Sequence, residues 1–174
     1  MEHEFEGMEI SVEDIDITFE KIYKKPYIPK EYIDDIKNAN VLIIPNEKFK
    51  EEDTLVFAEN TRELFDFLKE NSNKLITDIA ISDDDFQFVE LHSAVIEIAT
   101  IIVQSCVFSI LINVLSSFIY DQVKKCHRNR EDTSVHVEII VEEKKRKKTK
   151  KIKYKGPVSG IKDSLDEISK NLFS

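Results

Sequence analysis

The sequence predicts an α+β (mixed α/β) fold, in which short strands and helices surround one long hydrophobic helix. Three features favour it: short apolar runs between turn signals in the first half, an uncharged stretch of helix length, and an alternating strand pattern near the C-terminus. With 174 residues the chain is long enough for one compact core. We therefore expect a single domain, 1–174, made of an acidic α/β portion (1–93), a long hydrophobic helix (94–125) and a basic hairpin with a C-terminal helix (133–174).

The first portion contains brief elements separated by helix-breaking residues. Residues 1–25 fit either an extended edge segment or a short helix, and Pro26 and Pro29 then end any regular element. Asn60 is a favourable N-cap, with Glu63 at the capping-box position of the helix that follows. In chain order we expect a helix over 30–38, a buried strand over Val41–Ile44, a strand over 54–58, a helix after Asn60 that ends at 71–73, and a strand over 75–82.

The C-terminal portion predicts a hairpin followed by an amphipathic helix. Apolar and polar residues alternate over 135–142, and residues 151–155 alternate in the opposite sense, so the apolar side chains share one face. On the other face, Glu138 and Glu142 can lie opposite the lysines at 151, 153 and 155. Ser159 is a candidate N-cap for a final helix, whose apolar stripe is Ile161, Leu165, Ile168 and Leu172.

Charge is distributed unevenly along the chain, whose formal net charge is −9. Residues 1–97 carry 25 acids and 10 bases, residues 98–120 carry no charge, and residues 121–155 carry 6 acids and 13 bases. The opposite charges of the two ends favour their docking within one fold or between neighbouring copies. Net acidity argues against a general nucleic-acid binder, while the basic segment suits phosphate, anionic lipid or an acidic protein.

No combination of residues indicates an enzyme or a bound cofactor. Cys106 and Cys126 cannot form a disulfide framework, which favours a reducing compartment, and the acidic N-terminus lacks the pattern of a secretory signal. The four histidines have no metal-ligand spacing, and GPVSG at 156–160 places its serine outside the nucleophile-elbow pattern. We expect a cytoplasmic, non-enzymatic protein with no catalytic residues, no metal site and no cofactor.

Residues 98–120 form an uncharged run of 23 residues. As an α-helix the run would be about 35 Å long, enough to cross the roughly 30 Å hydrocarbon core of a membrane. One side of this helix would be apolar and suited to insertion: Val103, Val107, Ile110, Leu111, Val114, Leu115 and Phe118. Another side would carry small polar residues suited to helix packing or to lining a pore: Ser105, Ser109, Asn113 and Ser116.

Two interpretations of this run are open from the sequence. It can be the buried central helix of a soluble domain, or it can enter a membrane at some stage. Basic residues follow the run, so the positive-inside rule would send the acidic first 97 residues out of the cytoplasm, which argues against constitutive insertion. A latent helix, packed in a soluble form and released by a trigger or by oligomerisation, satisfies both observations.

Residues 144–151 (KKRKKTKK) form a basic tip between the hairpin strands. The tip can be a solvated, self-repelling loop, or it can contact anionic lipid, an acidic protein or nucleic acid. No aromatic residue lies among these lysines, which argues against recognition of single-stranded nucleic acid by base stacking. The candidate residues for anion or lipid contact are Lys144, Lys145, Arg146, Lys147 and Lys148.

Three segments carry a resemblance to known proteins: VFAENTRELFDFLKEN at 56–71, IYDQVKK at 119–125 and IKYKGP at 152–157. In layout they resemble small uncharacterised bacterial proteins of the antiphage-defence kind. The resemblance implies an intracellular sensor that recognises a phage component, assembles and breaches the inner membrane.

Together, the latent helix and this resemblance predict a membrane-acting defence protein that forms a pore or lesion. Its expected partners are a protein trigger of unknown identity, further copies of the chain and membrane lipid, and it would move from the cytoplasm to the inner membrane on activation. The alternative prediction is a soluble regulatory or immunity-type binding module, in which the long helix is core or oligomer interface.

Overall fold

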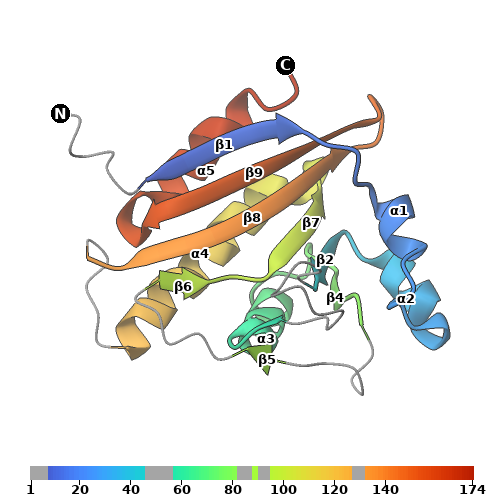
Figure 1. Ribbon diagram of the computed structural model, residues 1–174, viewed down its shortest axis with the longest axis horizontal. Helices are drawn as coiled ribbons and strands as arrows, with labels where there is room; N and C mark the ends of the chain where they lie inside the picture. Colours follow the sequence, from blue (N-terminus) through green and yellow to red (C-terminus); the bar gives the residue numbers. More distant parts are fainter. Residues whose placement is uncertain (1–7, 46–56, 82–87, 90–94, 127–131) are drawn as a thin grey trace.

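A mixed β-sheet forms the centre of the molecule. The computed structural model describes residues 8–45, 57–81, 88–89, 95–126 and 132–174 (Figure 1). The sheet has seven strands in the order β1-β9-β8-β7-β2-β4, with β6 paired to β8 beside β7, and β3 and β5 form a separate pair. The strands are β1 (Glu9–Asp14), β2 (Val41–Ile44), β3 (Phe57–Ala58), β4 (Thr77–Ile79), β5 (Phe88–Val89), β6 (Val95–Glu97), β7 (Thr100–Gln104), β8 (Ser134–Glu143) and β9 (Lys148–Pro157).

Two β-α-β units lie side by side in this sheet. Strands β2 and β4 are parallel and are joined through α3 (Thr61–Asn71), while β7 and β8 are parallel and are joined through α4 (Phe108–Lys125). The units meet where β2 pairs antiparallel with β7. Every residue of β2 is buried, as expected for a β-branched, apolar strand that is covered on both faces.

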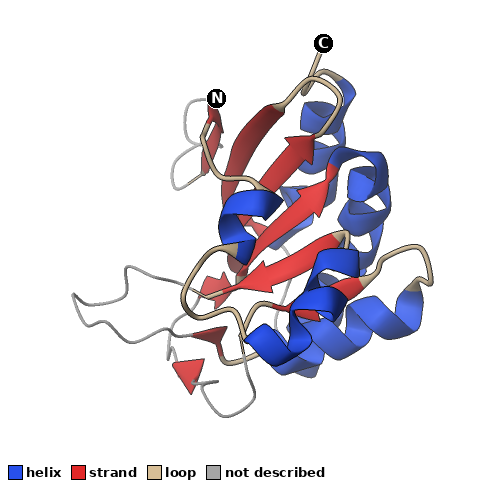
Figure 2. Cartoon of the chain, turned by 90° about the vertical axis from the view of Figure 1, so that its right-hand side faces the viewer, coloured by secondary structure: helices blue, strands red, loops and turns tan. Residues whose placement is uncertain are grey.

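Helices cover one face of the sheet along its width and the other face only in part. Helices α3, α4 and α5 (Ile161–Lys170) lie against the first face (Figures 1 and 2). On the second face, α1 (Phe19–Tyr23) and α2 (Ile33–Asn38) cover an apolar cluster that includes Leu42, Ile102 and Ile140. Among the described residues, no helix covers the second face over β1, β9 and the start of β8 (Figure 1).

The long hydrophobic helix is shorter than the uncharged run. Residues 95–97 and 100–104 are strands, Ser105–Val107 form a 3₁₀ turn, and α4 begins only at Phe108 and continues to Lys125. The prediction of one helix over 94–125 is therefore wrong in its first part. The physical reason is that the β-branched stretch 101–103 is paired on both sides, with β2 and with β8.

Helix α4 buries one side against the sheet and exposes another. Leu111, Ile112, Leu115 and Ile119 are 0% exposed. Of the set predicted for membrane insertion, Leu111, Leu115 and Phe118 are buried on this side, Val107, Ile110 and Val114 are half-buried, and Val103 lies in β7 instead. Ile112 and Ile119 belong to the buried side although the predicted apolar face omitted them. The long helix is therefore a core element of the domain.

The polar stripe predicted along this helix is divided by the structure. Ser109 and Asn113 are exposed, and so is Ser117, whose hydroxyl donates a hydrogen bond to the carbonyl of Asn113. Ser116 is buried, and its Oγ has no hydrogen-bond partner among the described residues. Ser105 precedes the helix and donates to Glu143 at 2.7 Å. The four residues thus do not form one stripe.

The two ends of the chain and the start of α3 test the remaining predictions of secondary structure. Residues 8–25 contain both predicted alternatives, since β1 is an edge strand and α1 a short helix. The hairpin and the final amphipathic helix are confirmed, but α5 begins at Ile161 and its N-cap is Gly160, not Ser159. Asn60 occupies the N-cap position of α3 without a side-chain hydrogen bond, so the predicted capping box is wrong. Residues 54–56 and 82 lie outside the described part of their predicted strands.

Candidate functional site

The hairpin strands β8 and β9 present two chemically different faces. Toward α4 and α5 they place Val135, Val137, Ile139, Val141, Ile152 and Tyr154, all of them buried. Because side chains alternate along a strand, the intervening residues lie on the second face, which α1 and α2 cover only near Ile140 and Glu142. Adding the residues that pair with them from β1 and β6, we define the charged sheet face as Glu9, Glu13, Glu97, His136, Glu138, Lys151, Lys153 and Lys155.

A β-bulge places Glu97 on this face. Ile101 lies four positions after Glu97, but their partners on β8, His136 and Ile139, are only three positions apart. The extra residue falls at Ile98–Ala99, both of which are buried against the α4 side. As a result, β6 directs Glu97 to the open face, whereas β7 directs Ile101 into the core.

His136 lies between two carboxylates at the centre of the charged sheet face. Its Nδ1 is 2.8 Å from Glu97 Oε2, and its Nε2 is 3.6 Å from Glu138 Oε1. The first contact is a hydrogen bond, while the second is long enough to count only as an ion pair. The exposed fractions of the three side chains are 25%, 30% and 25%. The imidazole is thus held on both sides in a half-buried position.

This arrangement fixes the charges of the cluster. The carboxylates of Glu138 and Glu97 raise the pKa of His136 to about 9, although partial burial opposes the rise. In return, His136 and then Lys151 lower the pKa of Glu138 to about 2 against the effect of burial. At neutral pH, His136 is therefore a cation and Glu138 an anion.

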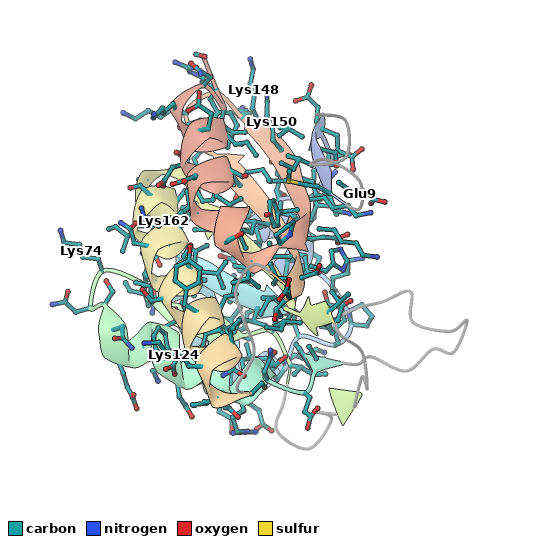
Figure 3. All side chains as sticks on the ribbon, turned by 90° about the vertical axis from the view of Figure 1, so that its left-hand side faces the viewer. Glu9, Lys74, Lys124, Lys148, Lys150 and Lys162 are labelled. Atoms are coloured by element: carbon teal, nitrogen blue, oxygen red, sulfur yellow. The ribbon has the colours of Figure 1, made fainter. Side chains whose placement is uncertain are left out.

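Further ion pairs continue the pattern across the strands. Lys151 Nζ is 3.4 Å from Glu138 Oε2, and Lys153 Nζ is 3.4 Å from Glu9 Oε2. The rows across the sheet are therefore acidic on β6, mixed on β8, where the His136 cation stands beside Glu138, basic on β9 and acidic again on β1. Figure 3 shows Glu9 on the side of the sheet away from α4 and α5. Opposite charges on adjacent strands stabilise the pairing and order the long side chains.

Only part of the predicted cross-strand pairing is confirmed. Glu138 lies directly opposite Lys153 in the register and pairs diagonally with Lys151. Glu142 lies opposite Thr149, and its carboxylate accepts a hydrogen bond from the backbone N–H of Phe19 at 3.2 Å. It therefore sits at the start of α1 and not among the lysines.

The basic tip lies apart from the charged sheet face. Lys144, Lys145, Arg146, Lys147 and Lys148 are all exposed, and Lys147 has a φ of 52°. The tip is shorter than predicted, because β9 begins at Lys148 and residues 149–151 are paired in the sheet. Arg146 donates to the carbonyl of Phe173, so the tip lies beside the C-terminal end of the described chain.

A polar pocket lies at the other end of the sheet, between α2, the end of α3 and β4. Its volume is about 450 Å³, and its lining includes Asp35, Asn38, Lys69 and Asp78. Burial, and secondarily the charge of Asp35, raises the pKa of Asp78. Within the described ranges, no group of three His, Cys, Asp or Glu side chains is placed to hold a metal ion. The charged groups of its lining are one cation, Lys69, and two carboxylates, Asp35 and Asp78.

Comparison with protein-family models, with curated proteins and with solved structures finds no match to this chain. The candidate site is therefore assigned from the geometry of the described residues alone. Glu9, Glu13, Glu97 and His136 are not predicted from the sequence to be parts of one surface. A usable signal was present for two of them, because the alternating acids of residues 9–13 complement the alternating lysines of residues 151–155. Glu97 and His136 carry no such signal, since the bulge that unites them is not visible in the sequence.

Proposed function

We propose that this chain is a soluble, non-enzymatic protein-binding module that presents the charged sheet face to a protein partner. The observation that carries the proposal is the ordered cluster of Glu97, His136, Glu138 and Lys151 on a part of the second sheet face that no described helix covers. Charges held in fixed positions favour specificity and fast association with a complementary surface. The long helix also supports the proposal of a soluble module. Its sheet-facing residues are fully buried, as in a helix that belongs to the core.

The test is a selection from a displayed library of protein fragments against the immobilised chain. Clones should be recovered that bind the wild type and lose binding to the double variant Lys153→Glu/Lys155→Glu. The matched control is Lys124→Glu/Lys170→Glu, which makes the same charge change at exposed positions of α4 and α5. Clones that respond equally to both variants, or no clones at all, would contradict the proposal.

A second candidate function is the membrane-acting role. The segment Ser105–Lys125 is long and apolar enough to cross a membrane by length and composition alone. We infer that such a role would require α4 to leave the core and a trigger or self-association to release it, with the basic tip contacting anionic head groups. The resemblance to antiphage-defence proteins supports the same candidate, which would act at the inner membrane as an oligomer.

Dye release from anionic vesicles separates the two candidates. Leakage that rises with protein concentration would support the membrane-acting role. Vesicles that stay sealed at every protein concentration, while cells expressing the chain keep their membrane potential, would exclude it and leave the binding module.

A further inference from the structure

Strand β1 is an edge strand whose outer backbone groups are available for pairing. Ile15 donates its N–H to its cross-strand partner Thr149 at 3.1 Å, which fixes the hydrogen-bonding phase of the β1–β9 ladder. In an antiparallel ladder, inward and outward backbone groups alternate. Odd-numbered residues of β1 therefore bond to β9, and Ile10, Val12 and Asp14 direct their N–H and C=O groups outward. No described strand pairs with this outer edge.

The side chains of β1 continue both layers of the sheet to this edge. Ile10 and Val12 lie opposite Tyr154 and Ile152, on the side of the helices, yet they are 45% and 43% exposed while their partners are buried. The apolar layer thus ends on two half-exposed side chains. Long edges that expose apolar residues are templates for a further strand unless something blocks them.

Charge complementarity identifies the kind of strand that fits. On the charged sheet face, the basic row of β9 is followed by Glu9 and Glu13 of β1. The next row that continues this alternation is basic. A strand with Lys or Arg on that side and apolar residues on the other would extend both layers at once.

We propose that β1 captures an extended segment of a partner protein in which basic and apolar residues alternate, so that it adds as an eighth strand to the sheet. This inference rests on the proposed binding function and names its partner class. A second copy of the chain fits this edge poorly. In the antiparallel register that sets Ile10 of one copy opposite Val12 of the other, Glu9 also lies opposite Glu13, which destabilises that pairing.

The probe is a synthetic peptide with the sequence KTKKIKYKGP, which is that of residues 148–157. The control peptide, KKKKKTIYGP, has the same composition without alternation. We expect the probe to bind the full chain at least tenfold more tightly than the control, as measured by fluorescence anisotropy. At saturation, amide hydrogen exchange at Ile10, Val12 and Asp14 should slow at least tenfold.

Two variants test the two parts of the argument. Val12→Pro removes an outward N–H without removing a bond to β9, and it should reduce probe affinity at least tenfold. Glu9→Lys/Glu13→Lys should also reduce probe affinity at least tenfold, because it replaces the acidic side chains that would face the basic residues of the probe. This variant does not require the fold to tolerate proline. The matched control, Glu31→Lys/Asp34→Lys at exposed positions near α2, should change affinity less than twofold.

Several results would overturn the inference. In the binding measurement, these are equal affinity for the two peptides or no binding of the probe. In the hydrogen-exchange measurement, it is protection confined to residues outside β1. In sedimentation, it is a wild-type dimer that becomes a monomer in the Val12→Pro variant. Library clones that depend on Lys153 and Lys155 but not on Val12→Pro would also overturn it, while leaving the proposed binding function intact.

Discussion

The two faces of strands β8 and β9 show how one hairpin serves two purposes. Toward α4 the strands contribute Val137, Ile139 and Tyr154 to a dry core, each at most 1% exposed. On the opposite face the same strands hold His136, Glu138 and Lys151 in ion pairs at half-buried positions. The first face gives the fold its stability, while the second gains little from burial and retains charges suited to recognition. Changes on the two faces should therefore have separable effects.

The largest expected effect is on the covered face. Leu115→Ala should lower the free energy of unfolding by about 2–5 kcal/mol, because the side chain is 0% exposed and its removal leaves a cavity. Leu111→Lys should abolish folding, since it buries a charge without a partner. Chemical denaturation followed by circular dichroism measures both. A folded, stable Leu111→Lys variant would show that α4 is able to leave the core.

The next effect is the pH dependence of the charged sheet face. The pKa of His136 lies near 9, above its ordinary 6.5, so its stabilisation is complete below about pH 6.5 and is lost as the pH rises through 9. The pKa of Glu138 lies near 2, below its ordinary 4.5, so its contribution is complete above about pH 4.5 and is lost only as the pH falls through 2. Their joint contribution is greatest between these limits, at about pH 4.5–6.5.

Replacing the imidazole should remove the upper part of this dependence. Between pH 6.5 and 9, the wild type should lose on the order of 1–3 kcal/mol that His136→Gln does not lose. Unfolding by urea at pH 5.5, 7.5 and 9.5 gives the comparison. Parallel curves for wild type and variant would show that the ion pairs seen on this face do not persist in solution.

How far the sequence predicts this molecule depends on the range of the interactions involved. The hairpin, the buried strand β2 and the stripe of α5 are visible because local alternation and helical spacing reflect burial directly. From the sequence the residues of β7 are predicted to be helical, because a strand buried on both faces and a buried helix have the same apolar composition. Pairing with β2 and β8 makes these residues a strand, and both partners lie far away in the sequence.

The candidate site was predictable only in its cross-strand part. Pairing of Glu138 with the lysines of β9 follows from the hairpin register. Glu97 joins His136 only because β6 pairs with β8 and a bulge shifts its phase, which are tertiary features. The edge position of β1 is likewise a property of the complete sheet order.

A smaller effect is expected at the basic tip, which belongs to neither face. Replacing any one of Lys144, Lys145, Arg146, Lys147 or Lys148 by Gln should weaken binding to anionic vesicles by about 1 kcal/mol, if the tip contacts lipid head groups. The effect should shrink as salt is added, because the residues are exposed and screened. Co-sedimentation with vesicles measures it. Binding that is unchanged in the fivefold Gln variant would identify the tip as a solvated turn.

The smallest expected effect lies on the exposed side of α4 and completes the comparison within one helix. Ser109→Lys and Asn113→Lys place a charge at exposed positions, so each should change the free energy of unfolding by no more than about 0.5 kcal/mol. Leu111→Lys makes a similar change on the buried side of the same helix and should prevent folding, which makes it the matched contrast. If α4 acts in a membrane instead, charges at Ser109 and Asn113 would keep assembly but shift the ion selectivity of the conductance. A single pair of measurements, unfolding in solution and conductance across a lipid bilayer, therefore distinguishes a helix that serves only as core from one that also lines a pore.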